Sequence, residues 1–137
     1  MKSKWLLTFV GFSGASAVAL GAFAAHGLKS QLSPYLLGVF ETGVTYQFWH
    51  TLAIALCAVL LSLPTGEKAQ KYFFRAAICF IIGIFCFSGS LYALALTGIK
   101  WFGPITPMGG LLFIIGWIML MLAALTPPDR RLSGCTN

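Results

Sequence analysis

Charged side chains are scarce in this sequence. They make up 9% of its 137 residues, and only three of them are acidic. Soluble domains average about 25% charged residues. Hydrophobic residues, in contrast, make up 58% of the chain, and the mean hydropathy is +0.88. The scarcity of charge therefore excludes an ordinary soluble domain and predicts that lipid surrounds most of the surface.

Cysteine pairs at metal-binding or redox spacings are also lacking. Cys57, Cys79 and Cys86 lie inside apolar runs, Cys135 lies in the C-terminal tail, and the sequence contains no Cys-x-x-Cys motif. Such cysteines are typical of small, polarizable packing residues. The pattern argues against a disulfide framework, and we expect neither a metal nor another cofactor.

Four apolar segments are each long enough to cross a bilayer as an α-helix, which takes about 20 residues. They cover about residues 5–25, 43–63, 73–96 and 108–125. Their continuous apolar character excludes the alternating pattern of membrane β-strands. We therefore predict a single all-α domain over residues 1–137, an integral membrane four-helix bundle.

The second segment needs a further element. Ser33 and Pro34 are typical of a helix start, as N-cap and first helical residue, and Pro64 is the next stop signal. A helix over this length would be about 45 Å long, which exceeds the hydrocarbon core of about 30 Å. We predict that residues 35–42 form a short interfacial helical segment, followed by a bend at Gly43.

The nine basic residues give the chain a net charge of +6. Because they lie in short segments between long apolar runs, membrane orientation explains them better than a nucleic-acid partner does. The predicted topology collects seven of them on one side, and the other side holds only Lys29 and Lys100. The seven are Lys2, Lys4, Lys68, Lys71, Arg75, Arg130 and Arg131. This bias predicts that both termini are cytoplasmic.

Small residues predict how the helices associate. Membrane helices pack where small side chains let two backbones approach, because lipid offers no hydrophobic driving force between them. Ser13, Ala17, Gly21 and Ala25 recur every four residues and should share one face of the first span. Gly89, Gly109 and Gly110 offer such positions in the third and fourth spans. The spacing does not distinguish packing within the chain from a seam between copies.

Polar side chains at membrane depth gather toward the outer half of the predicted bundle. Such groups are costly in hydrocarbon and usually face the bundle interior. The asymmetry predicts one outward-facing polar cavity, which Glu41 joins only if the helix bends at Gly43. The candidate members are His26, Glu41, Tyr46, Gln47, His50, Ser88, Ser90, Tyr92 and Thr106. Tyr46 and Trp49 are also predicted to be interfacial anchors.

Several chemical functions can be weighed for these residues. His26, His50 and Glu41 offer three possible metal ligands, but no spacing supports a site. Ser88 or Ser90 could pair with a histidine as a nucleophile, but the outer side lacks a second acid to orient the base. Structural roles compete with these: His50 bonded to a Tyr or Ser of another helix, and His26 capping the first helix. We therefore predict no catalytic residue and no metal site.

Four motifs, taken in order, resemble those of the YgdD-like small inner-membrane proteins. Residues 21–28 are similar to the GAFGAHGL signature, with Ala24 in place of a glycine. The later matches are residues 40–42, Tyr46, Gln47 and His50; residues 87–92; and Gly103, residues 105–107, Gly109, Gly110, Gly116 and Trp117. The resemblance implies four helices in a bacterial inner membrane. It implies no activity, since that family is a domain of unknown function, to which the eukaryotic transmembrane protein 256 is similar.

Two classes of function fit these observations. The preferred hypothesis is a non-catalytic membrane module, either an accessory subunit of a larger complex or a lipid or small-molecule binder that uses the outward cavity. The alternative is a small transporter or channel, which four short helices would form only as an oligomer. The expected partners are the lipid bilayer and either other membrane-protein subunits or further copies of the chain.

Overall fold

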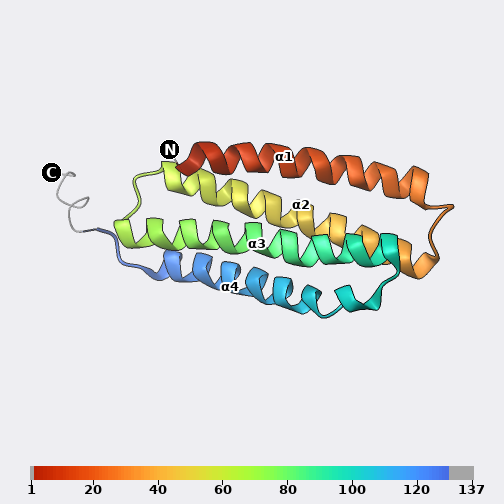
Figure 1. The fold of residues 1–137 in the computed structure, drawn as a ribbon. Helices are drawn as coiled ribbons and strands as arrows, with labels where there is room; N and C mark the ends of the chain where they lie inside the picture. Colours follow the sequence, from red (N-terminus) through yellow and green to blue (C-terminus); the bar gives the residue numbers. More distant parts are fainter. Residues whose placement is uncertain (1, 130–137) are drawn as a thin grey trace.

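A computed structural model describes residues 2–129 as four long helices that run antiparallel to their neighbours (Figure 1). The helices are α1 (Lys2–Phe23), α2 (Pro34–Ser62), α3 (Glu67–Thr97) and α4 (Ile105–Leu125). A π-helical turn, η1 (Ala24–Leu28), extends α1, and a short 3-10 turn, η2 (Lys100–Phe102), precedes α4. Each long helix is apolar enough to span a membrane, which confirms the predicted all-α membrane fold.

The helix ends follow local capping chemistry. The Ser33 hydroxyl accepts a hydrogen bond of 3.2 Å from the backbone N–H of Leu36, and Pro34 is the first residue of α2. At the end of α3, Gly98 has a φ of +71°, in the left-handed region that glycine adopts without strain. Its N–H donates to the carbonyl of Leu94 at 2.7 Å. These two signals were readable in the sequence.

The predicted bend at Gly43 is wrong, because α2 runs unbroken from Pro34 to Ser62. Residues 35–42 therefore continue the same helix and form no separate segment. Gly43 is buried against Tyr92, since an added Cβ would lie 2.7 Å from the tyrosine ring. Its carbonyl accepts a hydrogen bond of 2.7 Å from the Ser88 hydroxyl. The glycine permits the close approach of α2 to α3.

Each helix packs directly on the next one along the chain, and Figure 1 shows α1, α2, α3 and α4 in that order across the molecule. Aromatic side chains connect alternate helices. Trp5 of α1 lies with its ring centroid 6.3 Å from that of Phe74 in α3, and His50 of α2 lies 3.6 Å from Phe113 of α4. The helices therefore zigzag, which leaves one lateral groove between α1 and α3 and another between α2 and α4.

The small-residue face of α1 departs from the predicted strip at its last position. Ser13 and Ala17 are buried and Gly21 is half-buried, but Ala25 is exposed and Ala24 is buried in its place. A repeat of four residues advances about 400° and so drifts by about 40° at each step. After three steps Ala25 has left the contact face, which is the physical reason for the error.

The three glycines predicted at helix contacts differ in how closely they pack. An added Cβ at Gly109 would overlap the backbone of Phe87, so α3 and α4 are closest there. At Gly110 the same atom would only touch the Phe87 ring at 3.8 Å, and at Gly89 it would meet nothing within 4 Å. Of these three glycines, Gly109 is therefore the one that the α3–α4 contact requires.

Because four antiparallel helices follow one another, the start of α1, the end of α4 and the α2–α3 loop lie at the same end of the molecule. The N-terminus, the α2–α3 loop and the end of α4 lie together in Figure 1. This end carries five of the seven basic residues counted above, and Arg130 and Arg131 lie outside the described residues, as does Cys135. Lys29 and Lys100 belong to the loops at the opposite end.

Candidate functional site

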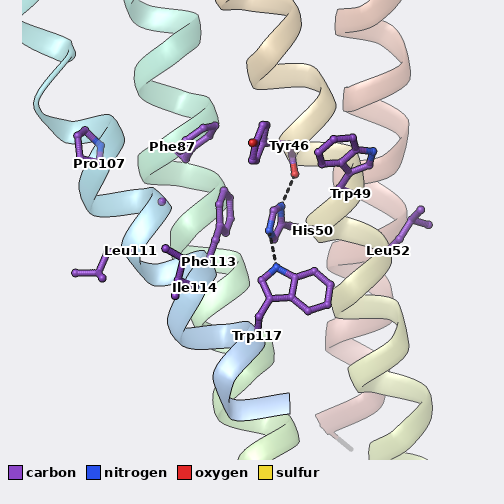
Figure 2. Close-up of a pocket in the computed structure, with 11 residues that line it drawn as sticks. Tyr46, Trp49, His50, Leu52, Phe87, Pro107, Leu111, Phe113, Ile114 and Trp117 are labelled. Carbon is purple, nitrogen blue, oxygen red and sulfur yellow. Dashed lines mark hydrogen bonds between the residues drawn. The ribbon is translucent and has the colours of Figure 1, made fainter. Parts of the chain in front are cut away.

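A groove of about 870 Å³ runs between α2 and α4, with α3 at its floor (Figure 2). Its walls are mainly aromatic, and most of its length is apolar. The aromatic side chains that line it are Tyr46, Trp49, Phe87, Phe113 and Trp117, with His50 among them. The groove lies on the side of the bundle, so its opening faces the bilayer rather than either aqueous phase.

His50 lies at the centre of this groove and is 4% exposed. Its Nδ1 is 2.8 Å from the backbone carbonyl of Tyr46, and its Nε2 is 3.1 Å from the indole nitrogen of Trp117 (Figure 2). A carbonyl only accepts and an indole N–H only donates. The proton of the imidazole is therefore on Nδ1, and Nε2 accepts. This arrangement holds the ring in one neutral tautomer and satisfies both nitrogens.

Aromatic stacking fixes the plane of the His50 ring. The ring lies parallel to that of Phe113, with 3.6 Å between centroids and an interplanar angle of 11°. Trp117 meets it edge-on, at 5.8 Å and 65°. Tyr46 packs against Phe87, with 4.6 Å between centroids. Such contacts add about 0.5–1.5 kcal/mol per pair beyond burial, so α2, α3 and α4 share one aromatic cluster.

The Tyr46 hydroxyl is a polar group of this groove that has no partner within residues 2–129, and the indole N–H of Trp49 is another. Within that range the hydroxyl makes no hydrogen bond, and no fully buried side-chain oxygen or nitrogen in that part of the chain lacks one. The hydroxyl is therefore not fully buried, and the Tyr46 side chain lines the groove. Figure 2 shows its oxygen on the side that faces Phe87.

A second polar network surrounds Gln47, which lies about 60° around α2 from His50. The Gln47 amide nitrogen donates to the Ser13 carbonyl and to the Ser16 hydroxyl, both at 2.9 Å. Its amide oxygen accepts from the Tyr92 hydroxyl at 2.6 Å. The Ser13 and Thr51 hydroxyls are 2.7 Å apart. This network joins α1, α2 and α3 beside a smaller recess of about 190 Å³.

The predicted single outward cavity is wrong. The Ser90 and Thr106 hydroxyls bond each other at 2.6 Å, and His26 and Glu41 are exposed, with no side-chain hydrogen bond to any residue of the described range 2–129. Together with the sets around His50 and Gln47, the candidates are divided among separate clusters that join different combinations of helices. The physical reason is angular: Gln47 and His50 are three residues apart and reach different neighbouring helices.

Four aromatic residues of the groove were not predicted as members of the site: Trp49, Phe87, Phe113 and Trp117. Trp117 had been noted only for its resemblance to a family motif. A signal was nevertheless present, because an indole N–H at membrane depth needs an acceptor. Tyr46 and Trp49 were predicted to be interfacial anchors, yet both line the groove.

Fold and site together define a membrane protein with four spans whose polar side chains are largely satisfied between its own helices. The family model described as protein of unknown function (DUF423) matches residues 20–110, and the chain belongs to this family. This confirms the resemblance found in the sequence. No solved structure matches the chain.

Relatives extend the match over most of the chain. A UPF0382 membrane protein of Haemophilus influenzae is 48% identical over 120 residues, which are 88% of this chain and 92% of the relative. A UPF0382 membrane protein of Staphylococcus aureus is 48% identical over 107 residues, 78% of this chain and 84% of its own. The UPF0382 inner membrane protein YgdD of Escherichia coli is 37% identical over 125 residues, 91% and 92%. These names place the relatives in membranes and state no activity.

Proposed function

We propose that this chain is a non-catalytic inner-membrane protein that binds a lipid-soluble small molecule in the groove between α2 and α4. The observation that carries the proposal is an aromatic-walled groove of about 870 Å³ with one unpartnered hydroxyl. Ligand sites in proteins are typically apolar recesses of about 300–1,000 Å³ with a few placed polar groups. The groove replaces the outward polar cavity as the proposed binding site.

The chemistry of the groove favours a flat ring that bears an oxygen. Trp49 and Trp117 are 55% and 47% exposed, so both present ring surface on which another ring can stack. The Tyr46 hydroxyl can donate to an oxygen of the ligand. A plain acyl chain would leave that hydroxyl without a partner in hydrocarbon, at a cost of several kcal/mol.

The state of His50 supports a binding role over a catalytic one. Both of its ring nitrogens are engaged within the protein, one as donor and one as acceptor. A general base needs a free nitrogen within hydrogen-bond reach of a substrate proton. His50 therefore orders the wall of the groove, and Tyr46 is the residue that would touch the ligand.

Ligand binding can be tested with a defined ring compound. The probe is 2-methyl-1,4-naphthoquinone, added to the full chain in lipid nanodiscs and followed by quenching of tryptophan fluorescence. Tyr46→Phe removes one hydrogen bond and should weaken binding by about two- to twelvefold, given about 0.5–1.5 kcal/mol per bond. Gly110→Leu should block the groove, because this glycine lines it.

The matched control is Gly89→Leu, the same change in the recess between α1 and α3. It should leave the quenching curve unchanged. Equal quenching in the parent chain, Tyr46→Phe and Gly110→Leu would reject the proposal, because the probe would then act from the bilayer. The same samples give the mass of the assembly by native mass spectrometry. A ring of several copies would support the alternative of an oligomeric transporter or channel.

A further inference from the structure

The first turns of α3 carry a basic face. Lys68, Lys71 and Arg75 are all exposed and are spaced three and four residues apart, which places them on one side of the helix. They line a recess of about 420 Å³ together with Glu67 and Tyr72. Three cations against one carboxylate leave this recess with a positive charge.

The basic face lies opposite the buried side of α3. Phe73 and Phe80 are buried in the core, and Phe80 lies nine residues from Lys71. At about 100° per residue, this separation puts the two side chains on opposite sides of α3. The cationic side chains therefore project laterally from α3. They lie at the end of the helix, at the depth of the lipid headgroups, and α3 continues from there into the membrane.

The same side of α3 becomes apolar further along. Ile82 is eleven residues after Lys71, about 20° away in angle, and Phe85 is about 40° away on the other side. Their side chains are 44% and 65% exposed. A line along the surface of α3 thus passes from cations to exposed hydrocarbon, which is the order of groups in a phospholipid.

The N-terminus of α1 adds a further cation beside this face. The Lys2 ammonium lies 4.5 Å from the ring centroid of Phe74, the residue before Arg75. Trp5, which meets the same ring edge-on, has the residue type that is enriched at membrane interfaces. Basic clusters on membrane helices attract anionic headgroups, by about 1 kcal/mol for each cation.

We propose that this end of α3 binds an anionic phospholipid. Its headgroup phosphate lies on Lys71 and Arg75, and an acyl chain runs along Ile82 and Phe85. The sideways direction and the apolar continuation favour a lipid over inorganic phosphate or a soluble acidic partner. The site is separate from the groove between α2 and α4 and stands independently of the function proposed for it.

The test compares lipids retained by the full chain in detergent, measured by native mass spectrometry. Phosphatidylglycerol and phosphatidylethanolamine are supplied in equal amounts, and phosphatidylglycerol should be retained preferentially. Lys71→Gln and Arg75→Gln should each weaken its retention about fivefold, equivalent to about 1 kcal/mol. Lys100→Gln, at the opposite end of the molecule, is the matched control and should change nothing.

Two results would overturn the proposal. One is a loss of selectivity: the parent chain retains the two lipids equally, or the double variant Lys71→Gln/Arg75→Gln keeps the parent preference for phosphatidylglycerol while melting at the parent temperature. The other is full displacement of phosphatidylglycerol by inorganic phosphate at the same concentration, which would identify a site for free anions. Arg75→Lys preserves the charge and should keep most of the preference for phosphatidylglycerol. Loss of that preference in Arg75→Lys would reject a site based on charge.

Discussion

His50 shows how one side chain can tie three helices together without a charge. Its Nδ1 is bonded on its own helix and its Nε2 is bonded to Trp117 of α4. Its ring stacks on Phe113 of α4 and lies with its centroid 5.5 Å from that of Phe80 in α3. An aliphatic residue at position 50 would fill similar space. It would leave the indole N–H without an acceptor inside the membrane, where water cannot replace it.

Trp117→Phe should lower the stability of the chain. The change keeps an aromatic ring but removes the donor to His50, and hydrogen bonds between membrane helices contribute about 0.6 kcal/mol on average and up to about 1.7 kcal/mol. We expect a loss in this range in an unfolding titration with sodium dodecyl sulfate. Trp101→Phe is the control, because Trp101 is 72% exposed in η2. Equal effects of the two changes would show that the bond adds nothing.

Tyr92→Phe tests the second network in the same way. The ring of Tyr92 packs against Phe40, with 4.9 Å between centroids, and this contact is preserved. Only the hydroxyl that donates to Gln47 is lost, so we expect a destabilisation of about 1 kcal/mol. The exposed Tyr35 provides the matched control, Tyr35→Phe. A thermal melt that is the same for all three proteins would contradict the assigned role of the hydroxyl.

At the scale of elements, local signals predicted the helices well and the contact faces less well. Ser33, Pro34 and Gly98 mark helix ends because capping acts over a few residues. Ala25 and Gly43 were misjudged, because which side of a helix meets a neighbour depends on the phase of the whole bundle. The partnership of His50 with Trp117 joins residues 67 positions apart and is fixed only by that packing.

Glycine substitutions should have opposite effects at the contact and at the free surface. Gly109→Ala would place a Cβ against the backbone of Phe87, and overpacking typically costs about 1–3 kcal/mol. Gly11→Ala is the control, because a Cβ on that exposed position of α1 meets nothing within 4 Å. It should leave stability unchanged or raise it by up to about 1 kcal/mol through helix propensity. A stable Gly109→Ala protein would mean that α3 and α4 are not in close contact there.

At the scale of the whole molecule, the zigzag order of the helices determines where a ligand can reach the protein. A closed square of four helices would enclose one central cavity, which is the arrangement that the polar residues predict. In the zigzag, His50 lines the groove between α2 and α4 and Gln47 lines the recess between α1 and α3, so the two residues belong to separate lateral openings. Composition predicts four spans but not this order, because each apolar helix could pack on any other.

The charge distribution predicts the orientation of the whole chain. Basic residues crowd the end that holds the N-terminus and the α2–α3 loop, so this end should face the cytoplasm. Cys135 follows the last span and is a native probe, whereas the other cysteines lie within apolar segments. An impermeant thiol reagent should label Cys135 in inverted vesicles and spare it in intact cells with a permeable outer envelope. Lys100→Cys in a Cys135→Ser background is the control and should be labelled in intact cells and spared in inverted vesicles. Labelling of Cys135 in intact cells at the rate seen in vesicles would establish the opposite orientation.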